Sequence, residues 1–169
     1  MKYNKIVLIG MMGSGKSSIS KILAKKINFT SIELDKLFEE QENISINDFF
    51  KKYGEKDFRE KEAKILIDSL QNKDIVLSTG GGIILKESNR KLLFKDNILT
   101  IFLEASSEII YERIKNDSSR PLLQVPNPKK EIEEILKKRE KYYNLAKIKI
   151  NTDNKTIEEI IEEILKWIK

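Results

Sequence analysis

Short apolar runs alternate along the chain with segments whose apolar residues recur every three or four positions. The runs suited to buried strands span residues 5–9, 31–34, 74–78, 98–103 and 147–151. Helical spacing covers residues 16–27, 57–70 and 107–114, and Thr156-Ile157-Glu158-Glu159 has the capping-box pattern that begins a last helix. This alternation favours parallel strands joined by right-handed helical crossovers, so we expect a three-layer α/β fold.

One irregular tract, residues 116–128 with the sequence NDSSRPLLQVPNP, holds all three prolines. It separates two helical segments and is longer than an ordinary connection. The functional interpretation is a lid that closes over bound ligands, and the alternative is a poorly ordered surface loop. Because no internal repeat or low-complexity linker divides residues 1–169, we expect a single domain.

The composition removes several kinds of chemistry. The chain contains no cysteine and no histidine. This excludes disulfides, cysteine nucleophiles, Ser-His-Asp triads and zinc sites of the Cys/His kind. Acid–base work therefore falls to carboxylates, lysines or tyrosines, and any metal should be a hard ion with oxygen ligands, such as Mg²⁺.

The charge and the apolar runs also bear on location and partners. The first run, Ile6-Val7-Leu8-Ile9, is too short for a signal peptide and leads directly into glycines. The net charge of +5 comes from lysines interleaved with glutamates, as in residues 129–134, which is typical of solvated helix faces. We expect a cytoplasmic monomer with neither nucleic-acid nor membrane partners.

Six of the seven glycines fall into two clusters, at Gly10, Gly13 and Gly15 and at residues 80–82. Residues 10–17, GMMGSGKS, match the P-loop pattern between an expected strand and an expected helix. In such a loop the backbone N–H groups of residues 13–15 surround phosphate, and Ser18 follows in the first helical turn. Lys16 would bridge the β- and γ-phosphates of ATP and Ser17 would ligate Mg²⁺.

The second cluster, Ser78-Thr79-Gly80-Gly81-Gly82, stands where a motor or ATPase would carry a magnesium-binding aspartate after its third strand. A GTPase is also disfavoured, because Asn72-Lys73-Asp74-Ile75 has its aspartate one place too early for a base-specifying motif. We therefore expect something other than a hydrolytic water to lie against Gly80–Gly82.

Ordered motifs along nearly the whole chain resemble the shikimate kinase family. They are the P-loop, Glu33-Leu34-Asp35, Asp57-Phe58-Arg59, the triple glycine, Ser119-Arg120-Pro121-Leu122-Leu123 and Arg139-x-x-x-Tyr143. The resemblance implies a P-loop kinase fold with five parallel strands in the order 2-3-1-4-5, flanked by helices, with a lid. It also implies transfer of the ATP γ-phosphate to the 3-hydroxyl of shikimate.

By position, the resemblance assigns the shikimate-binding residues to a helical region, about 35–62, and to the second glycine cluster. Asp35 corresponds to the aspartate that holds hydroxyls and accepts the reacting proton. Arg59 and Arg139 correspond to the pair that grips the substrate carboxylate. Gly80, Gly81 and Gly82 lie against the substrate, with the backbone of Gly81 also reaching the γ-phosphate.

The resemblance also implies nucleotide and metal contacts outside the P-loop. Arg120 corresponds to the lid arginine on the phosphates and Arg113 to one lying against adenine. Glu33 stands where the family usually has aspartate supporting Mg²⁺ through water. Residues 151–154 resemble the adenine-contact loop but lack the proline expected after it. Of the five arginines, only Arg90 looks like ordinary surface.

Several alternatives remain open. Arg59 and Arg139 could pair with helix glutamates such as Glu60 or Glu140. Asp35 could cap a helix that begins at Lys36. A kinase for another polyol acid, such as gluconate, would use the same fold, and a non-catalytic nucleotide-sensing module would keep the P-loop.

Overall fold

The computed structural model describes residues 2–117 and 125–168 of the 169-residue chain. Five parallel strands form one sheet with the order β2-β3-β1-β4-β5. The strands are β1 (Lys5–Ile9), β2 (Thr30–Glu33), β3 (Ile75–Ser78), β4 (Leu99–Glu104) and β5 (Ile148–Asn151). Strand order and direction confirm the expected fold.

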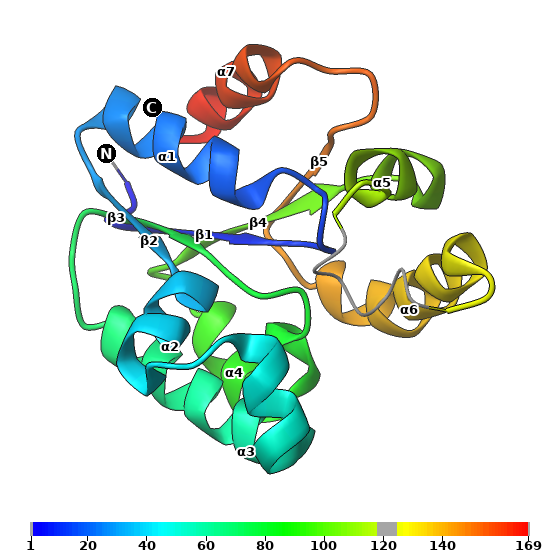
Figure 1. Ribbon diagram of the computed structural model, residues 1–169. Helices are drawn as coiled ribbons and strands as arrows, with labels where there is room; N and C mark the ends of the chain where they lie inside the picture. The colour runs from blue at the N-terminus through cyan, green and yellow to red at the C-terminus, as the bar shows by residue number, and fades with distance from the viewer. Residues whose placement is uncertain (1, 118–124, 169) are drawn as a thin grey trace.

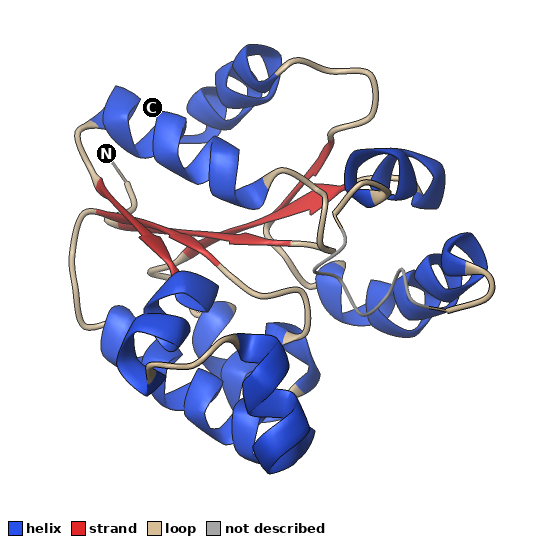
Figure 2. Cartoon of the chain, in the orientation of Figure 1, coloured by secondary structure: helices blue, strands red, loops and turns tan. Residues whose placement is uncertain are grey.

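Helices cover both faces of this sheet (Figures 1 and 2). One face carries α1 (Lys16–Ile27) and α7 (Ile157–Ile168), and the other carries α2 (Leu34–Glu42), α3 (Ile46–Ser69) and α4 (Glu87–Leu93). Beyond β4, α5 (Ser107–Ile114) packs against α6 (Pro128–Tyr143), and a 3₁₀ turn, η1 (Ile83–Leu85), precedes α4. Among the described residues, no helix has the length and apolar character needed to cross a membrane.

The central strand β1 is buried on both faces, which explains its continuous apolar sequence. Ile6 and Leu8 belong to the apolar core beneath α1 and α7. Val7 and Ile9 belong to the core beneath α2, α3 and α4, which includes a cluster of phenylalanines. The two cores hold the carboxyl end of β1, and therefore the loop that follows it, in a fixed place.

The helices at 16–27 and 107–114 have the bounds that the sequence predicts, and the strands agree within one residue. The capping box is also confirmed, because the Thr156 N–H donates to Glu159 Oε2 at 2.7 Å and the Glu159 N–H to Thr156 Oγ1 at 3.2 Å. The helix expected over 57–70 corresponds to the second part of α3, which follows the non-helical Gly54 and ends at Ser69, whereas the first part, from Ile46 to Gly54, was not predicted. The tract 116–128 was one residue too long, because Pro128 is the first residue of α6.

Candidate active site

The loop between β1 and α1 has the backbone conformation of a phosphate cradle. Gly13 and Gly15 have φ values of +77° and +93°, a region that residues with a side chain rarely adopt. Gly15 is the N-cap of α1, so the positive end of the helix dipole faces the loop. The buried Lys16 Nζ donates to the carbonyl oxygens of Gly10 and Met11, each at 2.9 Å. The ammonium group therefore lies within the loop.

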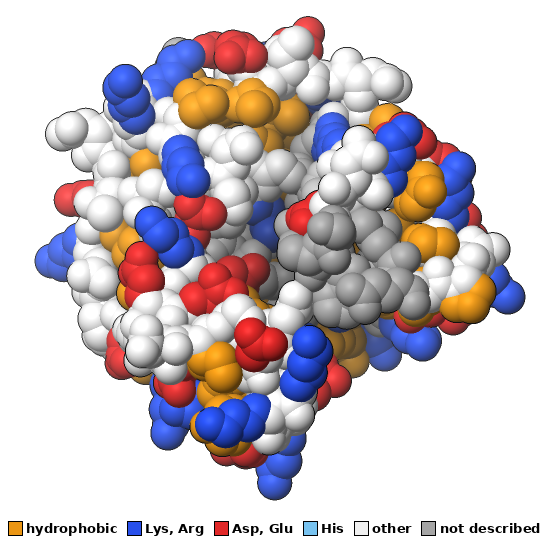
Figure 3. Space-filling view, viewed as in Figure 1, with side chains coloured by type: hydrophobic (Ala, Val, Ile, Leu, Met, Phe, Trp, Pro, Cys, Tyr) orange, Lys and Arg blue, Asp and Glu red, His pale blue; other side chains and the backbone are white. Residues whose placement is uncertain are grey.

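A cavity of about 210 Å³ opens at the carboxyl ends of the strands. Its lining brings together three separate parts of the chain: Met12, Gly13, Gly15, Lys16, Ser17 and Ser18 from the P-loop and α1, Asp35 from α2, and Thr79 and Gly81 after β3. Figure 3 shows this side of the molecule hollowed beside the lobe of α5 and α6, with acidic and basic side chains nearby.

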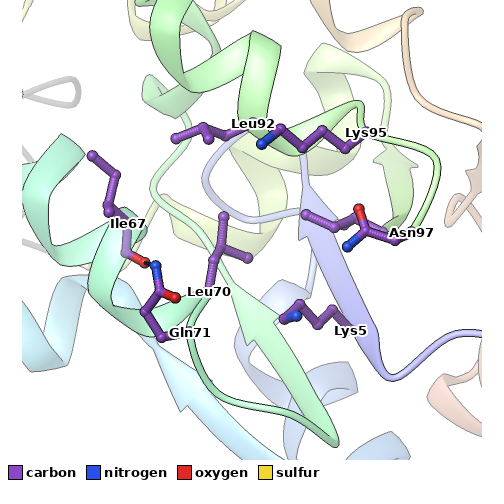
Figure 4. A pocket seen from close by; sticks show the side chains of 8 residues that line it. Lys5, Ile67, Leu70, Gln71, Leu92, Lys95 and Asn97 are labelled. Atoms are coloured by element: carbon purple, nitrogen blue, oxygen red, sulfur yellow. Dashed lines mark hydrogen bonds between the residues drawn. The ribbon is translucent and has the colours of Figure 1, made fainter.

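A second cavity, of about 190 Å³, lies at the opposite ends of the strands (Figure 4). The apolar side chains of Ile67, Leu70 and Leu92 form part of its lining, together with Lys5 and Lys95. Ligands of open α/β sheets bind outside the carboxyl ends of the strands. The cavity that contains the P-loop is therefore the candidate active site.

Oxygen ligands suited to Mg²⁺ meet beside the P-loop. Ser17 Oγ lies 3.5 Å from Ser78 Oγ, and Glu33 Oε1 lies 2.7 Å from Lys21 Nζ. Burial tends to raise the pKa of Glu33, but hydrogen bonds from Lys21 and Ser17, together with nearby lysine charges, outweigh it and hold that pKa below its usual value. Glu33 is therefore an anion in contact with the Ser17 hydroxyl.

This donor set fits Mg²⁺, which commonly takes one or two protein oxygens and completes its shell with water and phosphate. Among the residues described, no group of three or more Asp, Glu, His or Cys side chains could by itself enclose a metal ion. A magnesium ion at this site would therefore share its ligands with the nucleotide.

The glycines at 80–82 leave room for charged side chains. A Cβ on Gly80 would lie 2.9 Å from both Asp35 Oδ1 and Glu62 Oε1. A Cβ on Gly82 would lie 2.6 Å from Arg59 Cζ. Both distances are shorter than real Cβ contacts, so only glycine lets these three side chains approach the backbone here.

The middle glycine faces the second predicted carboxylate-binding arginine. A Cβ on Gly81 would lie 3.3 Å from Arg139 Nη1, and the same nitrogen lies 3.8 Å from Met11 Sδ in the P-loop. Arg139 comes from α6 and Arg59 from α3, so two distant helices deliver guanidinium groups to the same glycine segment. The structure thus brings together Asp35, both arginines and the triple glycine.

Glu62 is a site residue that the sequence reasoning missed. It is only 3% exposed, its Oε2 accepts from Arg59 Nη1 at 2.8 Å, and its Oε1 has no hydrogen-bond partner within the described residues. Burial raises the pKa of Glu62 above its ordinary value, and the neighbouring Asp35 adds to that rise, although Arg59 opposes it. The available signal was its position one helical turn after Arg59.

Arg59 does pair with glutamates of its own helix, as the alternative above held. Its partners are Glu62 at 2.8 Å and Glu55 at 3.4 Å, not Glu60. No ion pair joins Arg139 to Glu140 in the described part of the chain. The glutamate that holds Arg59 is itself buried in the site, so the pairing orients the guanidinium within the site.

The capping interpretation of Asp35 was wrong. The helix α2 begins at Leu34, with Glu33 in the N-cap position, so Asp35 lies inside the first turn. Its carboxylate reaches Gly80 and lines the cavity. The fold therefore directs Asp35 toward the P-loop.

Arg113 joins the P-loop to the loop after β5. Its Nη1 donates to the Gly13 carbonyl at 3.1 Å, and its Nη2 donates to the Thr152 carbonyl at 2.9 Å. The Arg113 side chain thus connects Thr152, within residues 151–154, to the P-loop. Arg120 and most of the proposed lid, residues 118–124, lie outside the described residues.

Comparison with known proteins places this geometry in a family. The family model described as shikimate kinase matches residues 12–169. The chain belongs to the shikimate kinase family. It is 43% identical to the shikimate kinase of Sulfurihydrogenibium sp., covering 97% of both chains, and 42% identical to that of Thermodesulfovibrio yellowstonii, covering 95% of this chain and 92% of the relative. Membership of the shikimate kinase family makes the protein an ATP-dependent kinase.

Solved structures of shikimate kinases agree with the fold. The Acinetobacter baumannii enzyme, solved in complex with shikimate, matches with a TM-score of 0.93 and 32% identity over 98% of this chain and 93% of that one. The Aquifex aeolicus enzyme matches with a TM-score of 0.84 and 35% identity over 97% and 95%. A gluconokinase from Sinorhizobium meliloti, at 18% identity and a TM-score of 0.60 over 96% and 90%, shares the fold alone.

Proposed function

We propose that this chain transfers the γ-phosphate of ATP to the 3-hydroxyl of shikimate, giving shikimate 3-phosphate and ADP. The observation that carries the proposal is the convergence of Asp35, Arg59 and Arg139 on a triple glycine that shares a cavity with the P-loop. An alcohol acceptor needs a group that takes its proton, and a carboxylate on the acceptor needs guanidinium groups that bind it through paired hydrogen bonds. The convergence supplies both beside the phosphate cradle.

On the nucleotide side, the N–H groups of Gly13, Ser14 and Gly15 would bind phosphate, with Ser18 next to them in α1. Lys16 would move its ammonium from the loop carbonyls to the β- and γ-phosphate oxygens, where negative charge develops. Arg113 would lie against adenine, a role supported by its bridge between the P-loop and residues 151–154.

For the metal, Ser17 would be a direct ligand of Mg²⁺, and Glu33 would hold it through water. When bound, the ion would neutralise charge on the phosphates. Glutamate has one methylene more than aspartate, and the contact with Lys21 at 2.7 Å holds its carboxylate beside Ser17. This anchoring supports a metal role for Glu33 despite the longer side chain.

On the substrate side, Arg59 and Arg139 would bind the carboxylate of shikimate, and Gly80, Gly81 and Gly82 would offer backbone N–H groups to the ring substituents and the γ-phosphate. Glu62 would hold Arg59 in its binding orientation. An Arg paired to a buried carboxylate keeps its planar guanidinium fixed, so little side-chain entropy is lost on binding.

Asp35 would orient the 3-hydroxyl and accept its proton. Its carboxylate lines the cavity with Lys16 and Ser17. Because the chain lacks histidine, a carboxylate is the natural base for this step. In a loose transition state the proton leaves late, so orientation by Asp35 contributes alongside its basicity.

The lid at 116–128 and the contact of Arg120 with phosphate remain predictions, as do a monomeric state and a cytoplasmic location. The function is tested by measuring ADP release with shikimate, gluconate and nucleoside monophosphates as acceptors. We expect turnover with shikimate and at least 10²-fold lower kcat/KM with the others. Equal turnover with gluconate, or none with shikimate, would reject the proposal.

A further inference from the structure

Every backbone carbonyl from Gly80 to Leu85 accepts a hydrogen bond from another group of the protein. The N–H of Ile83 donates to the Gly80 carbonyl, and the N–H of Leu85 donates to the Gly82 carbonyl. The Gly81 carbonyl accepts from the Tyr143 hydroxyl at 2.6 Å. The N–H groups of Gly81 and Gly82, in contrast, make no hydrogen bond within the described residues.

Side chains of α4 hold the rest of this segment. Asn89 Nδ2 donates to the Ile83 carbonyl at 3.0 Å. Arg90 Nη1 donates to the Ile84 and Leu85 carbonyls at 2.7 and 2.8 Å. Arg90 is therefore not the ordinary surface residue that its sequence suggested. It helps to fix the turn that follows the triple glycine.

The helix α6 closes on the same segment through two adjacent tyrosines. The Arg90 guanidinium lies over the Tyr142 ring, 4.2 Å from its centroid. Tyr143 is fully buried and stacks on Phe102 at 4.8 Å, with the planes 15° apart. Arg139 lies one turn before Tyr143 on α6, so the helix that carries an arginine to the site also anchors the glycine segment.

We propose that Tyr143 is a positioning residue for the acceptor substrate. In a trans peptide the Gly81 carbonyl and the Gly82 N–H point in opposite directions. By donating to that carbonyl, the Tyr143 hydroxyl fixes the direction in which the Gly82 N–H points. Because Tyr143 and Arg139 belong to the same helix, it also fixes the position of this N–H relative to the Arg139 guanidinium. The inference rests on the proposed function, because the glycine N–H groups are taken to face shikimate.

Burial supports a permanent role for this hydroxyl as a donor. It raises the pKa of the Tyr143 phenol above its usual value, although the nearby Arg139 opposes the rise, so the group keeps its proton at neutral pH. Removing the hydroxyl would leave the Gly81 carbonyl without its partner and free the peptide to rotate. ATP binds on the other side of the cavity, through the P-loop, and should be affected less.

The test uses Tyr143→Phe, which removes the hydroxyl and keeps the ring on Phe102. We expect the KM and the calorimetric Kd for shikimate to rise about tenfold, the value for one lost buried hydrogen bond, with the KM for ATP changed less than twofold. Tyr142→Phe is the matched control. It makes the same chemical change one residue away, where no hydroxyl contact reaches the glycines, and should leave both KM values within twofold of the wild type.

A lower melting temperature with an unchanged KM for shikimate would mean that Tyr143 is only structural and would overturn the inference. Equal increases for shikimate and ATP would also overturn it. If Tyr143→Phe fails to fold, Arg90→Met tests instead whether fixing this turn matters for shikimate. We expect the KM for shikimate to rise about threefold and the KM for ATP to stay unchanged, and an unchanged KM for shikimate would overturn the inference. A wild-type protein inactive on shikimate would instead reject the proposed function, independently of these variants.

Discussion

In the P-loop, Gly13 and Gly15 have positive φ values, whereas none of Gly80, Gly81 and Gly82 has a φ in that left-handed region. Both groups border the same cavity. The first group uses glycine to adopt the backbone angles of the P-loop. The second uses glycine because three charged side chains, those of Asp35, Arg59 and Glu62, occupy the space where a Cβ would stand. The same residue type thus provides backbone conformation in the P-loop and space for charged side chains at residues 80–82.

Among variants that test this comparison, we expect the largest loss of activity from a change at Asp35, whose carboxylate occupies the space that Gly80 leaves. Asp35→Asn keeps the shape of the side chain but removes the proton acceptor. We expect kcat to fall by about 10²–10⁴-fold, the usual range for a positioned base, with an unchanged melting temperature. Steady-state kinetics measure this. A loss below tenfold would assign orientation alone to Asp35, and full activity would remove it from the site.

Gly82→Ala tests the space argument directly. Its φ of −93° suits alanine, so the backbone should not be strained, but the new Cβ would displace the Arg59 guanidinium. We expect the KM for shikimate to rise on the order of 10²-fold, as when one partner of a desolvated ion pair is lost, with little change in stability or in the KM for ATP. A variant that lost stability but bound shikimate normally would contradict a spatial role.

Gly15→Ala tests the conformational argument. Alanine is strained at a φ of +93°, and its Cβ would also lie 3.3 Å from Ile19 Cδ1. We expect the free energy of unfolding to fall by about 1–3 kcal/mol and ATP binding to weaken more than shikimate binding. Urea unfolding and calorimetry measure the two effects. Selective loss of shikimate binding would erase the distinction between the clusters.

The smallest expected effect concerns Glu62, which also lies against Gly80. Because burial raises its pKa, the folded protein holds this proton more tightly than the unfolded chain does. The stability it contributes is therefore present at acidic pH and lost as the pH rises from the ordinary value of 4.5 through the raised pKa. Urea titrations at pH values from about 4.5 to 8 measure the free energy of unfolding. As the pH rises, this free energy should fall for the wild type relative to Glu62→Gln. Parallel curves would show that Glu62 does not titrate differently on folding.

Local patterns in the sequence were sufficient for much of the fold. The P-loop, the capping box at Thr156 and the buried run of β1 each depend on residues close together in the chain, and the structure has all of them. The part of α3 before Gly54 was not predicted in this way, because Gly54, with a φ of +83° and a ψ of 172°, interrupts the helical backbone between the two parts. Packing of phenylalanines on both sides of that glycine holds the two parts together.

By itself, the sequence determined the strand order, through family resemblance, and the residue types available for phosphotransfer. Only the tertiary structure decided which charged side chains lie against the second glycine cluster, which glutamate holds Arg59, and that Arg90 and Tyr143 fix the turn beside the site. The physical reason is that these contacts join α2, α3, α4 and α6, whose residues are far apart in the chain. Periodicity records which face of a helix is apolar, but not which distant carbonyl or carboxylate its polar side chains will meet.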